Sequence, residues 1–138
     1  MSYKTNFQEK LVTNQQIEEL KDNYAKKNYT FINAKRPANL PDANEFAYSL
    51  DEIEDYIAYF KAEAAKKGLK NLGLKIVLGQ YPEDRIFGKH QNPNTKGYQT
   101  ICIVPTAENE TIQTLEEGTQ KSANGISGLD FGTLRPPY

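Results

Sequence analysis

Two apolar runs dominate the pattern of hydrophobic and polar positions along the chain. In residues 72–81 (LGLKIVLGQY), Leu74, Ile76 and Leu78 occupy alternate positions, which is the period of two that a β-strand imposes. Residues 98–105 (YQTICIVP) are apolar at both sets of alternate positions, a pattern typical of a central strand that is covered on both faces. We expect these two runs to pair as neighbours in one antiparallel sheet.

Two further segments have the three-and-four spacing of amphipathic helices. The first, residues 14–27, follows a capping box that begins at Thr13 and carries a narrow apolar stripe. The second begins after a capping box of Ser49 and Glu52 and ends near Gly68. Its acidic first turn and basic last turn complement the helix dipole. We expect both helices to pack on one face of the sheet.

Polar segments rich in turn residues separate these elements. Residues 28–45 contain two prolines and predict a loop with a short edge strand at 29–32. Residues 46–48 predict a short strand that leads into the second helix. The remaining expected features are a long polar hairpin loop at 82–97, a helix at 107–120 and a proline-containing tail at 129–138 that adds a strand through Phe131.

The element order predicts a single α+β domain over residues 1–138, with an antiparallel sheet of three to five strands and two main helices on one face. Helices followed by strands, without alternating β-α units, argue against a doubly wound parallel sheet. A chain of 138 residues is long enough to bury its own core. The predicted core comprises Leu20, Tyr24, Ile53, Ile57, Phe60, Leu74, Ile76, Leu78, Ile101, Ile103 and Val104.

Charge and composition exclude several classes of function. The 17 basic and 18 acidic side chains nearly cancel, so no overall field favours binding to nucleic acid or to an anionic membrane. No apolar run is long enough for a membrane span, and the N-terminal residues lack the pattern of a secretory signal. The single cysteine, Cys102, cannot form an internal disulfide. We therefore expect a cytoplasmic protein.

Residues that carry chemistry are sparse. One histidine and one cysteine are too few for a zinc site, and neither a phosphate-binding loop nor a serine nucleophile motif is present. Cys102 lies in the middle of an apolar strand, where a thiol stays protonated and packs as a small core residue. We expect no metal, no cofactor and no catalytic residue. A small enzyme that uses His90 is the least favoured interpretation.

Three surfaces are better suited to contact than to chemistry, each with a plain structural alternative. The hairpin loop combines basic and aromatic side chains that could hold a ligand or an acidic partner, or could simply be solvated. The tail has a proline-rich form that recognition grooves bind, although a tail often only packs or frays. The outer side of the second helix is unusually smooth, but alanine is also the best helix former. The candidate contact residues are Tyr81, Arg85, Phe87, Lys89, His90 and Tyr98 in the hairpin, Arg135 and Tyr138 in the tail, and Ala58, Tyr59, Ala62 and Ala65 on the helix.

Three sequence blocks and the tail carry a resemblance to known proteins. The blocks are YIAYFKAEAAKKG at 56–68, KIVLGQYPE at 75–83 and GYQTICIVPT at 97–106. With the tail, this order resembles a group of small bacterial proteins of unknown function over residues 49–138. The resemblance implies a compact α+β domain and supplies no activity or ligand.

The functional hypothesis is therefore a non-catalytic cytoplasmic module for protein interaction or self-assembly. The alternative is a small-molecule or nucleotide-binding domain that uses the long hairpin loop.

Overall fold

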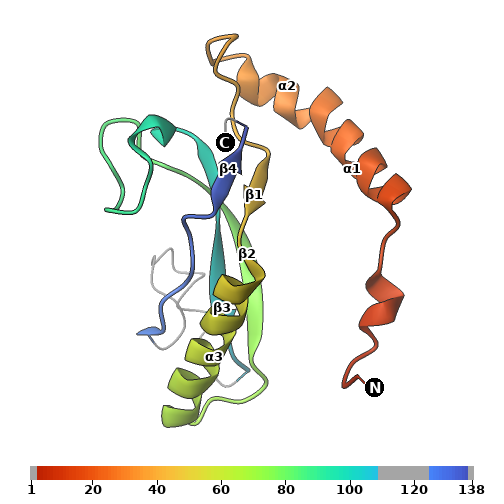
Figure 1. The fold of residues 1–138 in the computed structure, drawn as a ribbon, viewed down its shortest axis with the longest axis vertical. Coiled ribbons are helices and arrows are strands. Elements are labelled where there is room, and N and C mark those ends of the chain that lie inside the picture. The colour runs from red at the N-terminus through yellow and green to blue at the C-terminus, as the bar shows by residue number, and fades with distance from the viewer. Residues whose placement is uncertain (1–2, 109–124, 137–138) are drawn as a thin grey trace. The chain divides into compact units, whose positions relative to one another are not determined.

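The structure is a computed structural model that describes residues 3–108 and 125–136. It contains an N-terminal unit, residues 1–42, and a C-terminal unit, residues 43–138 (Figure 1). Its class is α+β, as the sequence predicts. The prediction of one domain over the whole chain stays a prediction, and most of the helix predicted at 107–120 lies outside the described residues.

The regular elements of the N-terminal unit are all helices among its described residues. They are the 3₁₀ helix η1 (Phe7–Lys10) and the α-helices α1 (Asn14–Lys26) and α2 (Asn28–Asn33). Helix α1 begins where predicted, because Thr13 Oγ1 accepts the Gln16 N–H at 3.1 Å and the Thr13 N–H donates to Gln16 Oε1 at 2.8 Å. These two bonds satisfy amide groups that would otherwise lack partners at the start of the helix.

The expected edge strand at 29–32 is wrong, since these residues form α2. The Thr30 hydroxyl donates to the Ala25 carbonyl at 3.0 Å, and the Tyr29 hydroxyl donates to the Asp42 carbonyl at 2.5 Å. The Tyr29 ring also lies 6.0 Å from that of Tyr24 on α1. These contacts with the preceding helix and the following loop override the strand preference of a short apolar run.

The N-terminal unit buries none of its large apolar side chains within residues 3–42. The predicted core position Leu20 is exposed, so that prediction is wrong. A narrow apolar stripe needs an opposing surface before it is covered, and nothing within these residues supplies one. The exposed apolar side chains are Tyr3, Phe7, Leu11, Val12, Ile17, Leu20, Phe31 and Leu40.

The C-terminal unit contains four strands, one long helix and one short 3₁₀ helix among its described residues. They are β1 (Glu45–Ala47), α3 (Leu50–Lys66), β2 (Gly73–Gln80), the 3₁₀ helix η2 (Pro93–Thr95), β3 (Gln99–Thr106) and β4 (Thr133–Arg135). The Ser49 hydroxyl accepts the Glu52 N–H at 3.0 Å, so α3 also begins at its predicted capping box. No helix in the described part of the chain is long and apolar enough to cross a membrane.

The strands form two antiparallel pairs, β2–β3 and β1–β4, and not the single sheet of three to five strands that the sequence predicts (Figure 1). The predicted pairing of the two long apolar runs is confirmed, with Ile76 opposite Ile103 and Gly79 opposite Thr100. The expected tail strand through Phe131 begins instead at Thr133.

The path of the tail explains why the sheets stay separate. Leu129 forms one antiparallel bridge with Ile103, and the two residues exchange hydrogen bonds of 2.8 Å. Phe131 then takes a left-handed backbone conformation, with φ of 63°, that directs the chain away from β3. The next three residues pair with β1, where Phe46 lies opposite Leu134.

Two apolar clusters form the core of this unit, and the tail contributes to both. Leu134 packs with Ala43, Tyr81 and Tyr98. Ile126 packs against Phe60 and Ala64 of α3. Residues 125–136 therefore belong to the folded structure of the C-terminal unit.

The predicted core is confirmed only in part. Phe60 and Ile103 are buried, and Tyr24, Ile53, Ile57, Ile101 and Val104 are half-buried. The prediction that three residues of β2 belong to the core is wrong, because the side chains of Leu74, Ile76 and Leu78 are 44%, 66% and 79% exposed. The alternation along this strand reports its extended backbone but not whether another element covers it.

Candidate functional site

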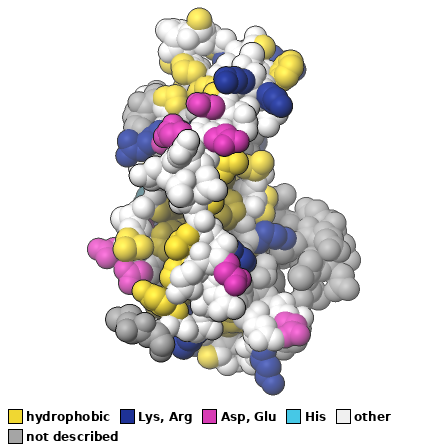
Figure 2. All heavy atoms as spheres, turned by 90° about the vertical axis from the view of Figure 1, so that its right-hand side faces the viewer, with side chains coloured by type: hydrophobic (Ala, Val, Ile, Leu, Met, Phe, Trp, Pro, Cys, Tyr) yellow, Lys and Arg dark blue, Asp and Glu magenta, His cyan; other side chains and the backbone are white. Residues whose placement is uncertain are grey.

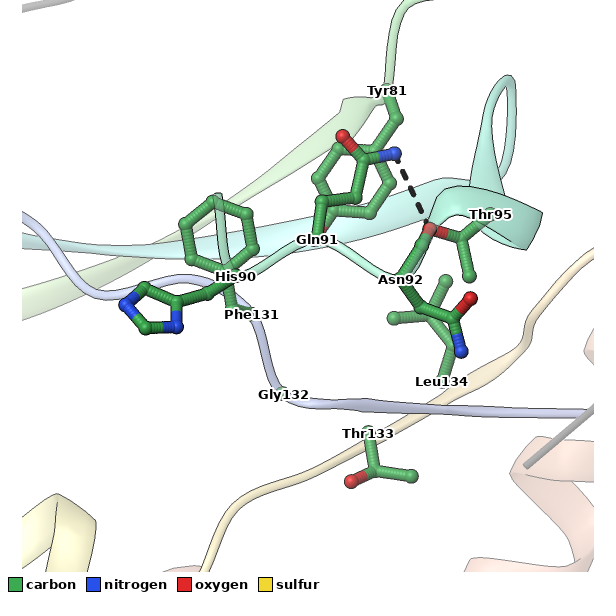
Figure 3. A pocket seen from close by; sticks show the side chains of 9 residues that line it. All are labelled: Tyr81, His90, Gln91, Asn92, Thr95, Phe131, Gly132, Thr133 and Leu134. Atoms are coloured by element: carbon green, nitrogen blue, oxygen red, sulfur yellow. Dashed lines mark hydrogen bonds between the residues drawn. The ribbon is translucent and has the colours of Figure 1, made fainter. Parts of the chain in front are cut away.

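The hairpin loop and the tail together enclose a half-open cavity of about 310 Å³ (Figure 3). The loop connects β2 to β3, and the tail residues before and within β4 form the opposite wall. The lining residues are Tyr81, His90, Gln91, Asn92, Thr95, Phe131, Gly132, Thr133 and Leu134. This volume is at the lower end of the range found for small-molecule sites.

Aromatic rings form one wall of the cavity. Tyr81 and Phe131 are stacked, with ring centroids 6.2 Å apart and an interplanar angle of 9°. Phe87 lies 6.1 Å from Tyr81 and 6.3 Å from Phe131, so the three rings form a single cluster. The backbone of Phe131 has a left-handed conformation where it places the ring in this cluster. For a bulky residue this conformation has a free-energy cost of the order of 1–3 kcal/mol.

A carboxylate behind this wall fixes the tail to the strands. One oxygen of Asp130 accepts the Thr100 hydroxyl at 2.8 Å, the Tyr81 hydroxyl at 3.1 Å and the Phe131 N–H at 2.6 Å. Hydrogen bonds to an ionised acceptor are stronger than those between neutral groups. Burial, together with the charge of Asp130, raises the pKa of Tyr81, so this hydroxyl stays a hydrogen-bond donor at neutral pH.

The loop wall is held by its own amide and hydroxyl groups. The buried Gln91 accepts the Phe87 N–H at 2.5 Å and donates to Thr95 Oγ1 at 3.2 Å. The Thr95 hydroxyl in turn donates to the Asn92 carbonyl at 2.7 Å. These groups are occupied within the loop, and the lining contains no Lys, Arg, Asp or Glu. The cavity therefore suits a small, neutral and partly aromatic ligand better than a phosphate.

The structure brings together part of the predicted hairpin site. Tyr81 and His90 line the cavity, and Phe87 stacks beside it. Tyr98 is buried in the core beneath, while Arg85 is exposed and lies 3.3 Å from its neighbour Asp84. Lys89 is also exposed.

The other predicted contact residues lie at the surface or outside the described part. Arg135 belongs to β4, where its carbonyl accepts the Asn44 N–H at 2.8 Å and its side chain is exposed. Tyr138 lies outside the described residues. The helix patch is exposed at all four of its positions, Ala58, Tyr59, Ala62 and Ala65. The contact roles of all these residues stay predictions.

Sequence reasoning missed Asp130 and Phe131 as members of this site. Asp130 reaches its partners across 30 and 49 positions of sequence, so no local spacing reveals them. The one available signal was an acidic and an aromatic residue between two glycines in the tail, GLDFG.

Cys102 has the properties of a packed thiol. Burial raises its pKa, and the nearby Asp130 carboxylate adds to the effect, so the thiol stays protonated at neutral pH. Within residues 3–108 and 125–136, no group of three or more His, Cys, Asp and Glu side chains is arranged to hold a metal ion. On the face drawn in Figure 2, basic and acidic side chains are interspersed, and hydrophobic side chains reach the surface between them.

The second candidate surface is the outer edge of β2. The backbone N–H of Tyr81 donates to the Tyr98 carbonyl at 2.9 Å, which identifies this pair of residues as a hydrogen-bonded pair of the ladder. Hydrogen-bonded and non-bonded pairs alternate along an antiparallel ladder, so Leu78–Ile101, Ile76–Ile103 and Leu74–Pro105 are non-bonded pairs. In this register the backbone groups of Ile103 and Pro105 point away from β2. Ile103 accordingly forms its hydrogen bonds with Leu129, and Pro105 has no N–H that would need a partner in β2.

The backbone N–H and C=O groups of Leu74, Ile76, Leu78 and Gln80 therefore point away from β3. In the described part of the chain, no hydrogen bond joins these groups to another residue. The side chains of Leu74, Ile76 and Leu78 are exposed at the same positions. An edge that combines unpaired backbone groups with apolar side chains is a ready template for another strand.

No family model, no curated protein and no solved structure matches the chain. The cavity and the outer edge of β2 are therefore the features of the molecule that indicate a function.

Proposed function

We propose that the protein is a non-catalytic interaction module that binds a further β-strand along the outer edge of β2. The observation that carries this proposal is the coincidence, at Leu74, Ile76 and Leu78, of outward backbone groups and exposed apolar side chains. Main-chain hydrogen bonds supply the affinity in such strand addition, and alternate side chains supply the specificity.

The small size of the β2–β3 sheet supports the same function. A two-stranded ribbon is marginal by itself, and stable sheets usually have three or more strands or a covering helix. One added strand extends this pair to three strands. Soluble proteins commonly protect an exposed edge with proline, bulges or several charges, whereas β2 carries the single charge of Lys75.

The test compares the full chain with an edge variant that carries Ile76→Lys and Leu78→Lys. Both side chains are exposed, so the variant keeps the monomer fold while charging the strand edge. Leu50→Lys is the matched control, because Leu50 is 74% exposed and belongs to α3, not to β2. Each protein is measured by light scattering over a concentration series and as bait in native lysate.

We expect self-association or partner retention in the wild type and in Leu50→Lys. In the edge variant the affinity for the added strand should fall at least about tenfold, because two charges must then be buried beside another strand. Equal behaviour of all three proteins would refute strand addition at β2.

A second candidate function is the binding of a small ligand in the hairpin cavity. It is favoured by the stacked Tyr81 and Phe131 rings and by the left-handed backbone of Phe131, since strained residues concentrate at binding sites. The neutral lining favours planar, uncharged heterocycles over nucleotides.

Thermal shift with a panel of nucleobases, nucleosides and aromatic metabolites tests the cavity. A ligand at one hundred times its Kd raises the stability of the folded state by about 2.7 kcal/mol. His90→Ala should weaken a genuine cavity ligand, because His90 lines the cavity and is exposed. Lys89→Ala is the matched control beside it. A shift that is unchanged by His90→Ala, or the absence of any shift, argues against this function.

A further inference from the structure

We infer that the strand bound by β2 is β2 of a second copy, paired antiparallel about a twofold axis through Val77. This inference rests on the proposed function and adds the identity of the partner and the register. The resulting assembly is a four-stranded antiparallel sheet in the order β3, β2, β2 of the partner and β3 of the partner.

The backbone geometry determines this register. Only Leu74, Ile76, Leu78 and Gln80 direct their N–H and C=O groups outward. A twofold axis at Val77 places Ile76 opposite Leu78 of the partner and Leu74 opposite Gln80 of the partner. Every outward group along the strand then has a partner, which gives about eight hydrogen bonds between the copies. A shift of the axis by one residue leaves at least one of these four residues outside the strand-to-strand ladder.

The side chains suit the same register. Ile76 and Leu78, the two most exposed apolar residues of the strand, meet directly across the interface. Val77 meets its own copy on the opposite face. Lys75 lies opposite Gly79 of the partner, so the charged side chain faces a residue with no side chain and not another lysine.

Charge favours the antiparallel over the parallel arrangement. The residues that lead into β2, KKGLK at 66–70, are basic, and those that follow it, PEDR at 82–85, have a net negative charge. Antiparallel pairing brings the basic approach of one copy beside the acidic exit of the other. Parallel pairing brings like charges together and places Lys75 close to its copy, which costs affinity.

Disulfide trapping tests the register directly. In a Cys102→Ala background, Val77→Cys places two thiols at the twofold axis in a non-hydrogen-bonded pair, where Cα atoms lie about 4.5 Å apart. This separation lies within the range that a disulfide spans. Lys75→Cys is the matched control, because it lies on the same face and is offset from its copy by four residues, or about 13 Å.

We expect mild oxidation of the full-length protein to convert Val77→Cys into a covalent dimer at least about tenfold faster than Lys75→Cys. The Cys102→Ala parent should show concentration-dependent dimerisation by light scattering, and adding Leu78→Lys should weaken it at least about tenfold. Circular dichroism melting of each variant verifies that the monomer remains folded.

Two outcomes overturn this inference. Equal cross-linking of the two cysteine variants refutes the register, and a monomer at all concentrations refutes the second copy. In the latter case, strand addition survives only if the wild type retains a different protein that the Ile76→Lys, Leu78→Lys variant loses. If the edge variant and the wild type behave alike, the proposed function fails as well.

Discussion

The paired strands β2 and β3 have the same length of eight residues and similar apolar content, yet they differ in their surroundings. On β3, Ile103 is only 7% exposed, and the tail residue Leu129 bonds to the far side of the strand. On β2, every residue after Gly73 is exposed. Apolar alternation therefore indicates an extended strand, while burial depends on what packs beside it.

The difference is sharpest at Ile103 and Ile76, which lie directly opposite each other. Ile103→Ala should lower the free energy of unfolding by about 2–4 kcal/mol, because it leaves a cavity in a packed region. Ile76→Ala should cost less than about 1 kcal/mol in the monomer, because water already surrounds most of that side chain. Denaturant unfolding at low protein concentration measures both values. Equal losses would contradict the difference in burial.

Substitutions at two glycines test whether the tail packs closely against β3. A Cβ atom at Gly128 would lie 2.7 Å from the Ile103 carbonyl oxygen, whereas one at Gly79 on β2 would meet only Thr100 Cγ2, at 3.8 Å. Gly128→Ala should therefore destabilise the protein by about 1–3 kcal/mol, since a backbone must shift. Gly79→Ala should be neutral or slightly stabilising, because alanine has less freedom to lose on folding. Thermal unfolding of the pair measures the contrast.

Removal of the Asp130 carboxylate tests how the tail is held against β3. Asp130→Ala leaves the hydroxyls of Thr100 and Tyr81 without their shared acceptor, which should cost about 1–3 kcal/mol. Asp130→Asn keeps an acceptor oxygen and should recover part of the loss. Chemical denaturation with amide exchange at Ile103 measures the effect. Unchanged exchange in Asp130→Ala would show that the tail covers β3 without this anchor.

Alkaline pH should weaken the attachment of α3 to the tail. The Tyr56 hydroxyl donates to the Ser127 carbonyl at 2.8 Å, and burial, together with electrostatic repulsion from Cys102, raises the Tyr56 pKa to about 12 from 10.0. Below pH 10 both the folded and unfolded states keep this proton, so its contribution to stability is complete. Between pH 10 and 12 the unfolded chain releases the proton first, and stability falls.

We expect a loss of about 1 kcal/mol from Tyr56 after allowance for solvent screening. Tyr56→Phe should have a shallower loss of stability above pH 10, measured by thermal unfolding over a pH series together with tyrosinate absorbance. Tyr59→Phe is the control, because Tyr59 is exposed on the same helix. Equal pH profiles of the two variants would contradict a role for Tyr56.

Part of the candidate site could be predicted from the sequence. The mixed aromatic and basic composition of the loop pointed to Tyr81, Phe87 and His90, which do lie at or beside the cavity. The composition also pointed to Tyr98, which is buried, since an aromatic residue suits a core as well as a binding surface. Asp130 could not be found in this way, because its partners are distant in sequence.

The sequence by itself determined where the two long helices begin and where the two long strands lie. Capping boxes at Thr13 and Ser49 begin the long helices, because the bonds that cap a helix join residues three apart. Alternation located β2 and β3, because side chains of an extended chain point to opposite faces in turn.

Only the tertiary structure decided which strand is covered and how many sheets form. The turn at Phe131 sends the tail from β3 to β1, and the hydrogen bonds of Asp130 hold it there. Burial is a property of what approaches from elsewhere in the chain, and the residues that make those approaches carry no local signal of their partners. For the same physical reason, no residue in the described part of the chain pairs with the outer edge of β2.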